Sequence, residues 1–206
     1  MRKQLILGSR LLLFVLSLTG TFLEIYKYGG HMLMYYTVLS NLFVTLFTFY
    51  LVLEMVIGKD WERTSLLRVK GGVTMSIMIT CVIYHFMLAP LADDFWRVEN
   101  LLCHYIVPLY FLADTLLLDR PRQYRWFDPI IWTALPLLYM VFGLFNGLVL
   151  KIPIPDADDS PFAYFFLNVT KYGWAYVLTY AGTIFVAYLL AGFVLYGLKR
   201  LDFTKK

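Results

Sequence analysis

Long apolar runs separated by short polar segments dominate this chain. Six runs reach the length of about 20 mostly apolar residues that a membrane-spanning helix needs; they cover residues 4–26, 32–57, 71–92, 100–118, 129–150 and 172–198. None of them alternates polar and apolar residues like a barrel strand, and a lipid-exposed backbone must otherwise be helical to satisfy its own hydrogen bonds. The pattern therefore predicts an all-α, polytopic membrane protein in which residues 1–206 form a single domain of six transmembrane helices.

Composition supports this interpretation. Hydrophobic residues make up 60% of the chain and charged residues 16%, whereas soluble domains average about 45–50% and about 25%. The balance excludes a soluble nucleic-acid-binding protein, and we expect lipid and the bilayer as partners. Cys81 and Cys103 fall inside predicted helices, so no disulfide framework is expected. The basic start resembles a secretory signal, but residues 18–21 make a poor cleavage site, and we interpret the first run as a retained helix.

The basic residues indicate an orientation. When Lys and Arg are assigned to the two sides that alternate between successive helices, fourteen of the 18 fall on the side of the amino terminus. The other side has only Lys27, Arg97, Lys151 and Lys171, and it carries the acidic residues Asp93, Asp94, Glu99, Asp156, Asp158 and Asp159. By the positive-inside rule, both termini are then cytoplasmic, and the net charge of +4 mostly reflects topology.

Polar residues inside the membrane are costly, so their positions indicate either helix contacts or a site. Thr37, Asn41, Thr45 and Thr48 recur on one face of the second helix. At a rise of about 1.5 Å per residue, Thr37, His104 and His85 lie about 8, 6 and 10 Å below the outer boundary, all in one layer.

A threonine and a histidine in one layer could form a reaction centre. An imidazole can take the proton from a threonine hydroxyl and so activate it as a nucleophile. The alternatives are a hydroxyl that returns to a backbone carbonyl one turn back and a histidine that only satisfies core hydrogen bonds. No carboxylate lies at this depth, so a neutral partner would have to orient His104; the residues considered are Asn100, Tyr105, Tyr176 and His85. Asn41 is either an oxyanion donor or a packing contact.

A second polar cluster is expected near the cytoplasmic face. Arg10, Glu54 and Asp114 reach similar depth on three helices. A buried arginine usually pairs with a carboxylate, so we interpret them as a structural ion pair of Arg10 with Asp114 or Glu54.

The connection before the last span also carries signals. Ser160 and Pro161 resemble an N-cap and a first helical position, which predicts a short interfacial helix before Gly173 leads into the last span. This helix is either a lid over the site or a plain connector. Gly143 and Gly147 on the fifth helix allow close packing inside the protein or between copies, so a homo-oligomer is one expectation.

Two segments resemble the paired signatures of a known family. They are Tyr35 to Asn41 and His104 to Pro108, running on to Asp114, and the stretch from Pro161 to Asn168 adds to the likeness. Together with the six-helix spacing they resemble the androgen-induced-gene (AIG/ADTRP-like) family of intramembrane threonine hydrolases, and most closely its bacterial six-helix relatives.

The resemblance implies a function. Animal members hydrolyse fatty acid esters of hydroxy fatty acids, and their roles would fall on Thr37 as nucleophile and His104 as general base, with no cofactor. The residues around both positions follow the bacterial pattern, so a bacterial plasma membrane is the expected location and the substrate can differ. Two other functions stay open: a non-enzymatic lipid-binding or carrier protein, and a b-type haem carrier with His85 and His104 as axial ligands. No metal site is expected, because Cys81 with His85 is the one combination on a shared face.

Overall fold

The computed structural model describes residues 1–92, 94–154, 157 and 160–201. The outer acidic residues Asp93, Asp156, Asp158 and Asp159 and the basic residues Lys205 and Lys206, all used above to infer orientation, lie outside the described residues. Within the described part the regular elements are helices, with no strand. The main helices are α1 (Arg2–Tyr28), α2 (Tyr36–Val56), α3 (Thr64–Ile83), α4 (Val98–Leu101), α5 (Val107–Leu117), α6 (Asp128–Trp132), α7 (Ala134–Phe145) and α8 (Val169–Leu198).

Short 3-10 and π-helical turns extend or link these helices. The 3-10 turns are η1 (Gly30–Met34), η3 (Ala89–Leu91) and η7 (Phe165–Leu167); the π-helical turns are η2 (Tyr84–Leu88), η4 (Leu102–Ile106) and η5 (Asn146–Leu150). Each π turn lies at the end of the bundle away from the termini. Such turns often occur at functional sites.

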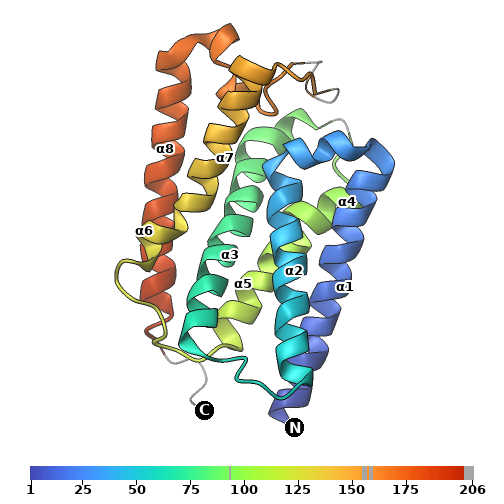
Figure 1. Ribbon diagram of the computed structural model, residues 1–206, viewed down its shortest axis with the longest axis vertical. Coiled ribbons are helices and arrows are strands. Elements are labelled where there is room, and N and C mark those ends of the chain that lie inside the picture. The colour runs from blue at the N-terminus through green and yellow to red at the C-terminus, as the bar shows by residue number, and fades with distance from the viewer. Residues whose placement is uncertain (93, 155–156, 158–159, 202–206) are drawn as a thin grey trace.

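The six predicted spans are confirmed as six helical segments long and apolar enough to cross a membrane. They are Arg2–Tyr28, Tyr36–Val56, Thr64–Leu91, Val98–Leu117, Asp128–Leu150 and Val169–Leu198. Because the number of spans is even, α1 begins and α8 ends at the same end of the bundle, which we call the terminal end (Figure 1). The opposite end, which we call the distal end, carries the turns η1, η2, η4 and η7 (Figure 1).

The first four spans form the body of the bundle. α1 packs on α2, α2 on α3, and α5 lies against both α1 and α3. The last two spans are attached to one side: α6 and α8 pack against α3, and α8 has the least buried apolar window of the six, 17% (Figure 1). The apolar residues of α8 therefore point mostly outward from the bundle, as expected for a membrane-spanning helix that is hydrophobic all round.

The third span begins seven residues before the predicted boundary at Gly71, so Lys70 lies inside α3 and is fully buried. Its ammonium group pairs with Asp114 and with Asp119, 2.7 Å away. Arg10 donates to the same two carboxylates, at 3.3 Å to Asp114 and 2.6 Å to Asp119. The ammonium group of Lys199 donates to the backbone carbonyls of Thr115 and Asp119. The charges of Arg10 and Lys70 thus neutralise those of Asp114 and Asp119, which allows α3 to continue through a charged stretch.

Of the two alternative partners predicted for Arg10, the structure brings Asp114 to it and not Glu54. Glu54 pairs with Arg63 in the following loop, and Lys59 lies 4.0 Å from it. Asp119, which lies just outside the predicted span 100–118, is the second carboxylate that Arg10 contacts. The physical reason is that Glu54 lies at the last turn of α2, where a loop arginine reaches it without leaving the solvent-exposed surface.

We predict that Arg10→Ala destabilises the fold by about 3–5 kcal/mol, because it leaves two buried carboxylates with one cation. The measurement is the melting temperature and the monodisperse yield in detergent. Arg2→Ala is the matched control, since the Arg2 side chain is 60% exposed and contacts Glu62 at 3.5 Å. Normal stability of Arg10→Ala together with lost activity would contradict the structural role.

Candidate active site

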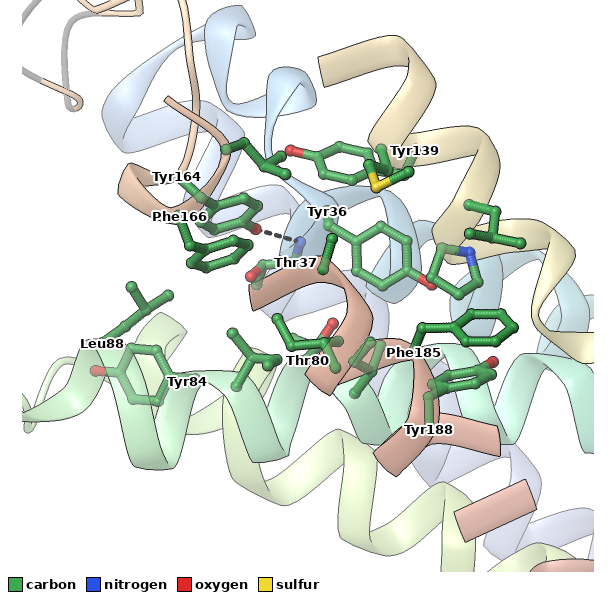
Figure 2. Close-up of a pocket in the computed structure, with 18 residues that line it drawn as sticks. Tyr36, Thr37, Thr80, Tyr84, Leu88, Tyr139, Tyr164, Phe166, Phe185 and Tyr188 are labelled. Carbon is green, nitrogen blue, oxygen red and sulfur yellow. Dashed lines mark hydrogen bonds between the residues drawn. The ribbon is translucent and has the colours of Figure 1, made fainter. Parts of the chain in front are cut away.

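Thr37 occupies the second position of α2, at the distal end of the bundle. The helix begins at Tyr36, after the extended residue Tyr35. The first four N–H groups of a helix have no partner within the helix, and the Thr37 N–H donates instead to the hydroxyl oxygen of Tyr164, 3.4 Å away (Figure 2). Thr37 thus carries both a hydroxyl and a helix-terminal N–H beside a tyrosine.

The same position sets the Thr37 hydroxyl apart from other helical threonines. Deeper in the helices the hydroxyls of Thr45, Thr74 and Thr21 return to the carbonyl four residues back, at 2.8–2.9 Å. Such a bond occupies the hydroxyl proton. Thr37 Oγ1 instead lies 3.4 Å from Nε2 of His104. The proton of this hydroxyl is therefore directed at an imidazole and not at its own helix.

His104 lies in the π-helical turn η4 and is 7% exposed. Its Nδ1 is 3.0 Å from the backbone carbonyl oxygen of Asn100. A carbonyl oxygen only accepts hydrogen bonds, so Nδ1 carries the proton, and Nε2 of the neutral ring is left as the acceptor. The tautomer is thus the one that a general base toward Thr37 requires.

The residues considered as orienting partners take different places. The Asn100 side chain donates to the Phe95 carbonyl at 2.8 Å, so its backbone orients His104. His85 is exposed, and its Nδ1 lies 3.2 Å from the Tyr105 hydroxyl. Tyr176 packs between Tyr172 and Tyr180 on α8. The structure brings none of these three side chains, His85, Tyr105 or Tyr176, to His104.

Tyr84, which was not singled out from the sequence, packs on His104. The two rings stack with centroids 3.7 Å apart and an angle of 26°. Tyr84 is one residue before His85 and is buried. At this end of the third span it is therefore Tyr84, and not His85, that points into the bundle. The large aromatic ring buries more apolar area than an imidazole, which favours this choice of face.

Asn41 acts as a contact between helices. It is fully buried, and its amide nitrogen donates to the carbonyls of Thr37 and Cys103, at 2.9 and 3.0 Å. Both donors of the amide are therefore used on backbone oxygens. Asn41 holds α2 against η4, which fixes the separation of Thr37 and His104, and it has no donor left for an oxyanion.

Two cavities meet at Thr37. The polar chamber has a volume of about 370 Å³ and includes Glu24, Tyr28, Arg97, Asn100 and His104 in its wall. The apolar pocket has a volume of about 100 Å³ and runs between α3, α7 and α8, with Ile79, Met140, Ile184 and Phe185 among its walls (Figure 2). Four residues line both cavities: Thr37, Tyr84, Leu88 and Tyr164.

The segment that carries Tyr164 differs from the helix expected at Ser160 and Pro161. No helix begins there, and the regular turn of this segment is η7. Phe162, Tyr164 and Phe166 alternate along the chain and are 2–8% exposed, because each inserts into the aromatic core between α2, α7 and α8. Asn168 is the N-cap of α8, accepting from the Lys171 N–H at 3.0 Å, and Gly173 with φ of 80° breaks the helix one turn later. This segment, 160–168, plugs the distal end and is called the plug below.

Gly143 and Gly147 contact the plug of their own chain. A Cβ on Gly147 would overlap the ring of Phe162, and one on Gly143 would lie 3.2 Å from Leu167. Asn146 between them donates to the Pro161 carbonyl at 2.6 Å. The close approach that these glycines permit is therefore between α7 with η5 and the plug.

The histidines are not arranged for a haem. Both nitrogens of His104 face groups of the bundle, and His85 lies on the exposed side of its helix. His31 lies in the turn η1. In the part of the chain that the structure describes, no three His, Cys, Asp or Glu side chains are grouped so that they could hold a metal ion.

No protein-family model, no curated protein and no solved structure matches the chain.

We predict that Gly147→Ala loosens the plug, because the added methyl group displaces the Phe162 ring from its contact with η5. Overpacking of this kind costs about 1–3 kcal/mol. The measurement is the melting temperature in detergent, with hydrogen exchange of the peptide that contains Tyr164 as the local readout. Gly182→Ala is the control, since a Cβ there meets nothing within 4 Å. Equal stability and exchange in the two variants would show that the glycine is not needed for the plug.

Proposed function

We propose that this protein is an intramembrane hydrolase of fatty acyl esters that uses Thr37 as nucleophile and His104 as general base. The observation that carries the proposal is the contact of Thr37 Oγ1 with the unprotonated Nε2 of His104, at the junction of a polar and an apolar cavity. The resemblance to the androgen-induced-gene family points to the same two residues, and it suggests fatty acid esters of hydroxy fatty acids as substrates.

The reaction follows the general pattern of nucleophilic acyl transfer. His104 Nε2 takes the proton of the Thr37 hydroxyl as Oγ1 bonds to the ester carbon, and the carbonyl π electrons move to the oxygen. When the tetrahedral intermediate collapses, the bond to the alcohol oxygen breaks and Nε2–H returns the proton to that oxygen. Water then repeats the sequence on the acyl-threonine and releases the fatty acid. The Asn100 carbonyl supports the charged imidazolium at Nδ1 throughout.

The two cavities fit the two parts of such a substrate. The apolar pocket, at about 100 Å³, would take the acyl carbons next to the carbonyl, and the polar chamber, with Arg97 and Glu24 in its wall, would take the polar side of the ester and the water. Leu137 on α7 and Phe185 on α8 line the apolar pocket and are each 37% exposed. The pocket therefore reaches the lipid-facing surface between these helices, which would let a chain enter from the bilayer.

The topology belongs to the same proposal. The excess of basic residues at the terminal end supports cytoplasmic termini in a bacterial plasma membrane. The distal end, with the polar chamber and the plug, would then lie at the outer leaflet, where an ester headgroup meets the interface.

Activity-based labelling tests the two proposed residues. We expect a fluorophosphonate probe to label the purified protein, Thr37→Ala to abolish labelling, and His104→Ala to slow it about 100- to 10,000-fold, the usual contribution of a general base. Thr45→Ala and His85→Ala are matched controls that should label normally, because the Thr45 hydroxyl bonds its own helix and His85 faces outward.

Two outcomes would overturn the proposal. Labelling that survives Thr37→Ala would remove the threonine nucleophile. Failure of the wild-type protein to react with any probe or lipid ester, combined with tight lipid binding, would favour the carrier function.

Reporter fusions test the orientation. In a bacterial host we expect alkaline phosphatase fused after Lys151, between α7 and α8, to be active, and the same enzyme fused to the carboxyl terminus to be inactive. Green fluorescent protein should give the opposite pattern. Activity of the carboxyl-terminal phosphatase fusion would reverse the proposed topology.

A further inference from the structure

The proposed hydrolase needs a donor for the oxygen that becomes charged when Thr37 attacks. Removal of one such donor usually lowers the turnover rate by two to three orders of magnitude. Asn41, the donor proposed from the sequence, donates both of its amide N–H groups to the Thr37 and Cys103 carbonyls. The donor must therefore come from another group at the junction of the two cavities.

Tyr164 is placed to be that group. Its side chain comes from the plug, lines both cavities, and reaches Thr37 with its hydroxyl (Figure 2). The ring is held by stacking on Phe166, with centroids 5.1 Å apart, and by edge contacts with Tyr35 and Tyr139 at 5.7 and 6.0 Å. The hydroxyl therefore has a fixed position, as a preorganised donor requires.

In the hydrogen bond between Thr37 and Tyr164, the tyrosine hydroxyl is the acceptor. The Thr37 N–H can only donate, so the Tyr164 oxygen is its acceptor and the phenolic proton is not used in this bond. A hydroxyl that accepts a hydrogen bond becomes a better donor, because chains of hydrogen bonds polarise one another. Burial raises the pKa of the Tyr164 phenol above its ordinary value, so the proton is present at neutral pH.

We propose that Tyr164 is the oxyanion donor of the hydrolase, its O–H hydrogen bonding to the carbonyl oxygen of the ester while Thr37 Oγ1 attacks the carbon. This inference rests on the proposed function. The tyrosine keeps its proton throughout: the negative charge stays on the substrate oxygen, the Thr37 proton goes to His104, and the Tyr164 hydroxyl donates only a hydrogen bond. The plug thereby becomes a catalytic element as well as a cover.

Steady-state hydrolysis by Tyr164→Phe is the first test, with a medium-chain p-nitrophenyl ester as substrate. We expect kcat to fall about 100- to 1000-fold with KM little changed, because the bond forms fully only in the transition state. Tyr110→Phe is the matched control: it also removes a partly buried tyrosine hydroxyl, one that bonds Ser9 outside both cavities. Equal kcat in wild type and Tyr164→Phe, or an equal loss in Tyr110→Phe, would overturn the inference.

A pair of inhibitors separates donation from packing. An alkyl trifluoromethyl ketone forms a hemiketal oxyanion with a hydroxyl nucleophile, whereas the methyl ketone of the same chain stays largely uncharged. We expect Tyr164→Phe to weaken the trifluoromethyl ketone about 10- to 100-fold relative to the methyl ketone, since hydrogen bonds to charged groups are the stronger ones. Equal weakening of both ketones would mean that Tyr164 only shapes the cavity.

A measurement on the unaltered protein complements the variants. In the structure of wild-type protein with the trifluoromethyl ketone, the Tyr164 oxygen should lie about 2.5–3.0 Å from the hemiketal oxygen. A hemiketal oxygen bonded to other donors would overturn the inference even though Thr37 had reacted. Absence of any adduct on Thr37 would instead contradict the proposed function, so the two failures are distinguishable.

Discussion

The candidate site depends on one hydrogen bond, from Nδ1 of His104 to the backbone carbonyl of Asn100. In a low-dielectric bundle this bond decides which nitrogen carries the proton, and therefore which nitrogen can accept one from Thr37. Serine hydrolases commonly give this role to a buried carboxylate. A carbonyl does the same orienting work without bringing a charge into the membrane, where an unpaired carboxylate would be costly.

The buried ion pairs lie instead at the two ends of the bundle. At the terminal end Arg10 and Lys70 face Asp114 and Asp119, and the four side chains are almost completely buried. At the distal end, Lys27 pairs with Glu99 at 2.8 Å, beside Tyr28 in the wall of the polar chamber. The neutral Thr37, His104 and Tyr164 lie toward the distal end, where the Asn41 amide ties α2 to η4. This division leaves three neutral side chains at the candidate site, next to an apolar pocket.

The sequence predicts the architecture well because a membrane span can be recognised from a local property, a long apolar run. It also predicts that Thr37 and His104 share a layer, since depth follows from helical rise.

The sequence does not distinguish Tyr84 from His85, because both are within one turn of Cys81 and packing selects the face. It offers Asp114 or Glu54 for Arg10 and does not find Asp119, because Asp119 lies in the turn after α5 and its direction depends on the turn conformation. The contact of Tyr164 with Thr37 is missed because it depends on a non-helical plug. The alternation of Phe162, Tyr164 and Phe166 was the available signal for that segment.

The most direct test of the central claim is to map the modified residue. After reaction of the wild-type protein with a fluorophosphonate, tandem mass spectrometry of the peptides identifies the side chain that carries the phosphonyl group. We expect a single adduct on Thr37 Oγ1. An adduct on Ser40, which lies one turn further along α2 and bonds the Thr37 carbonyl, or on any other residue, would contradict it.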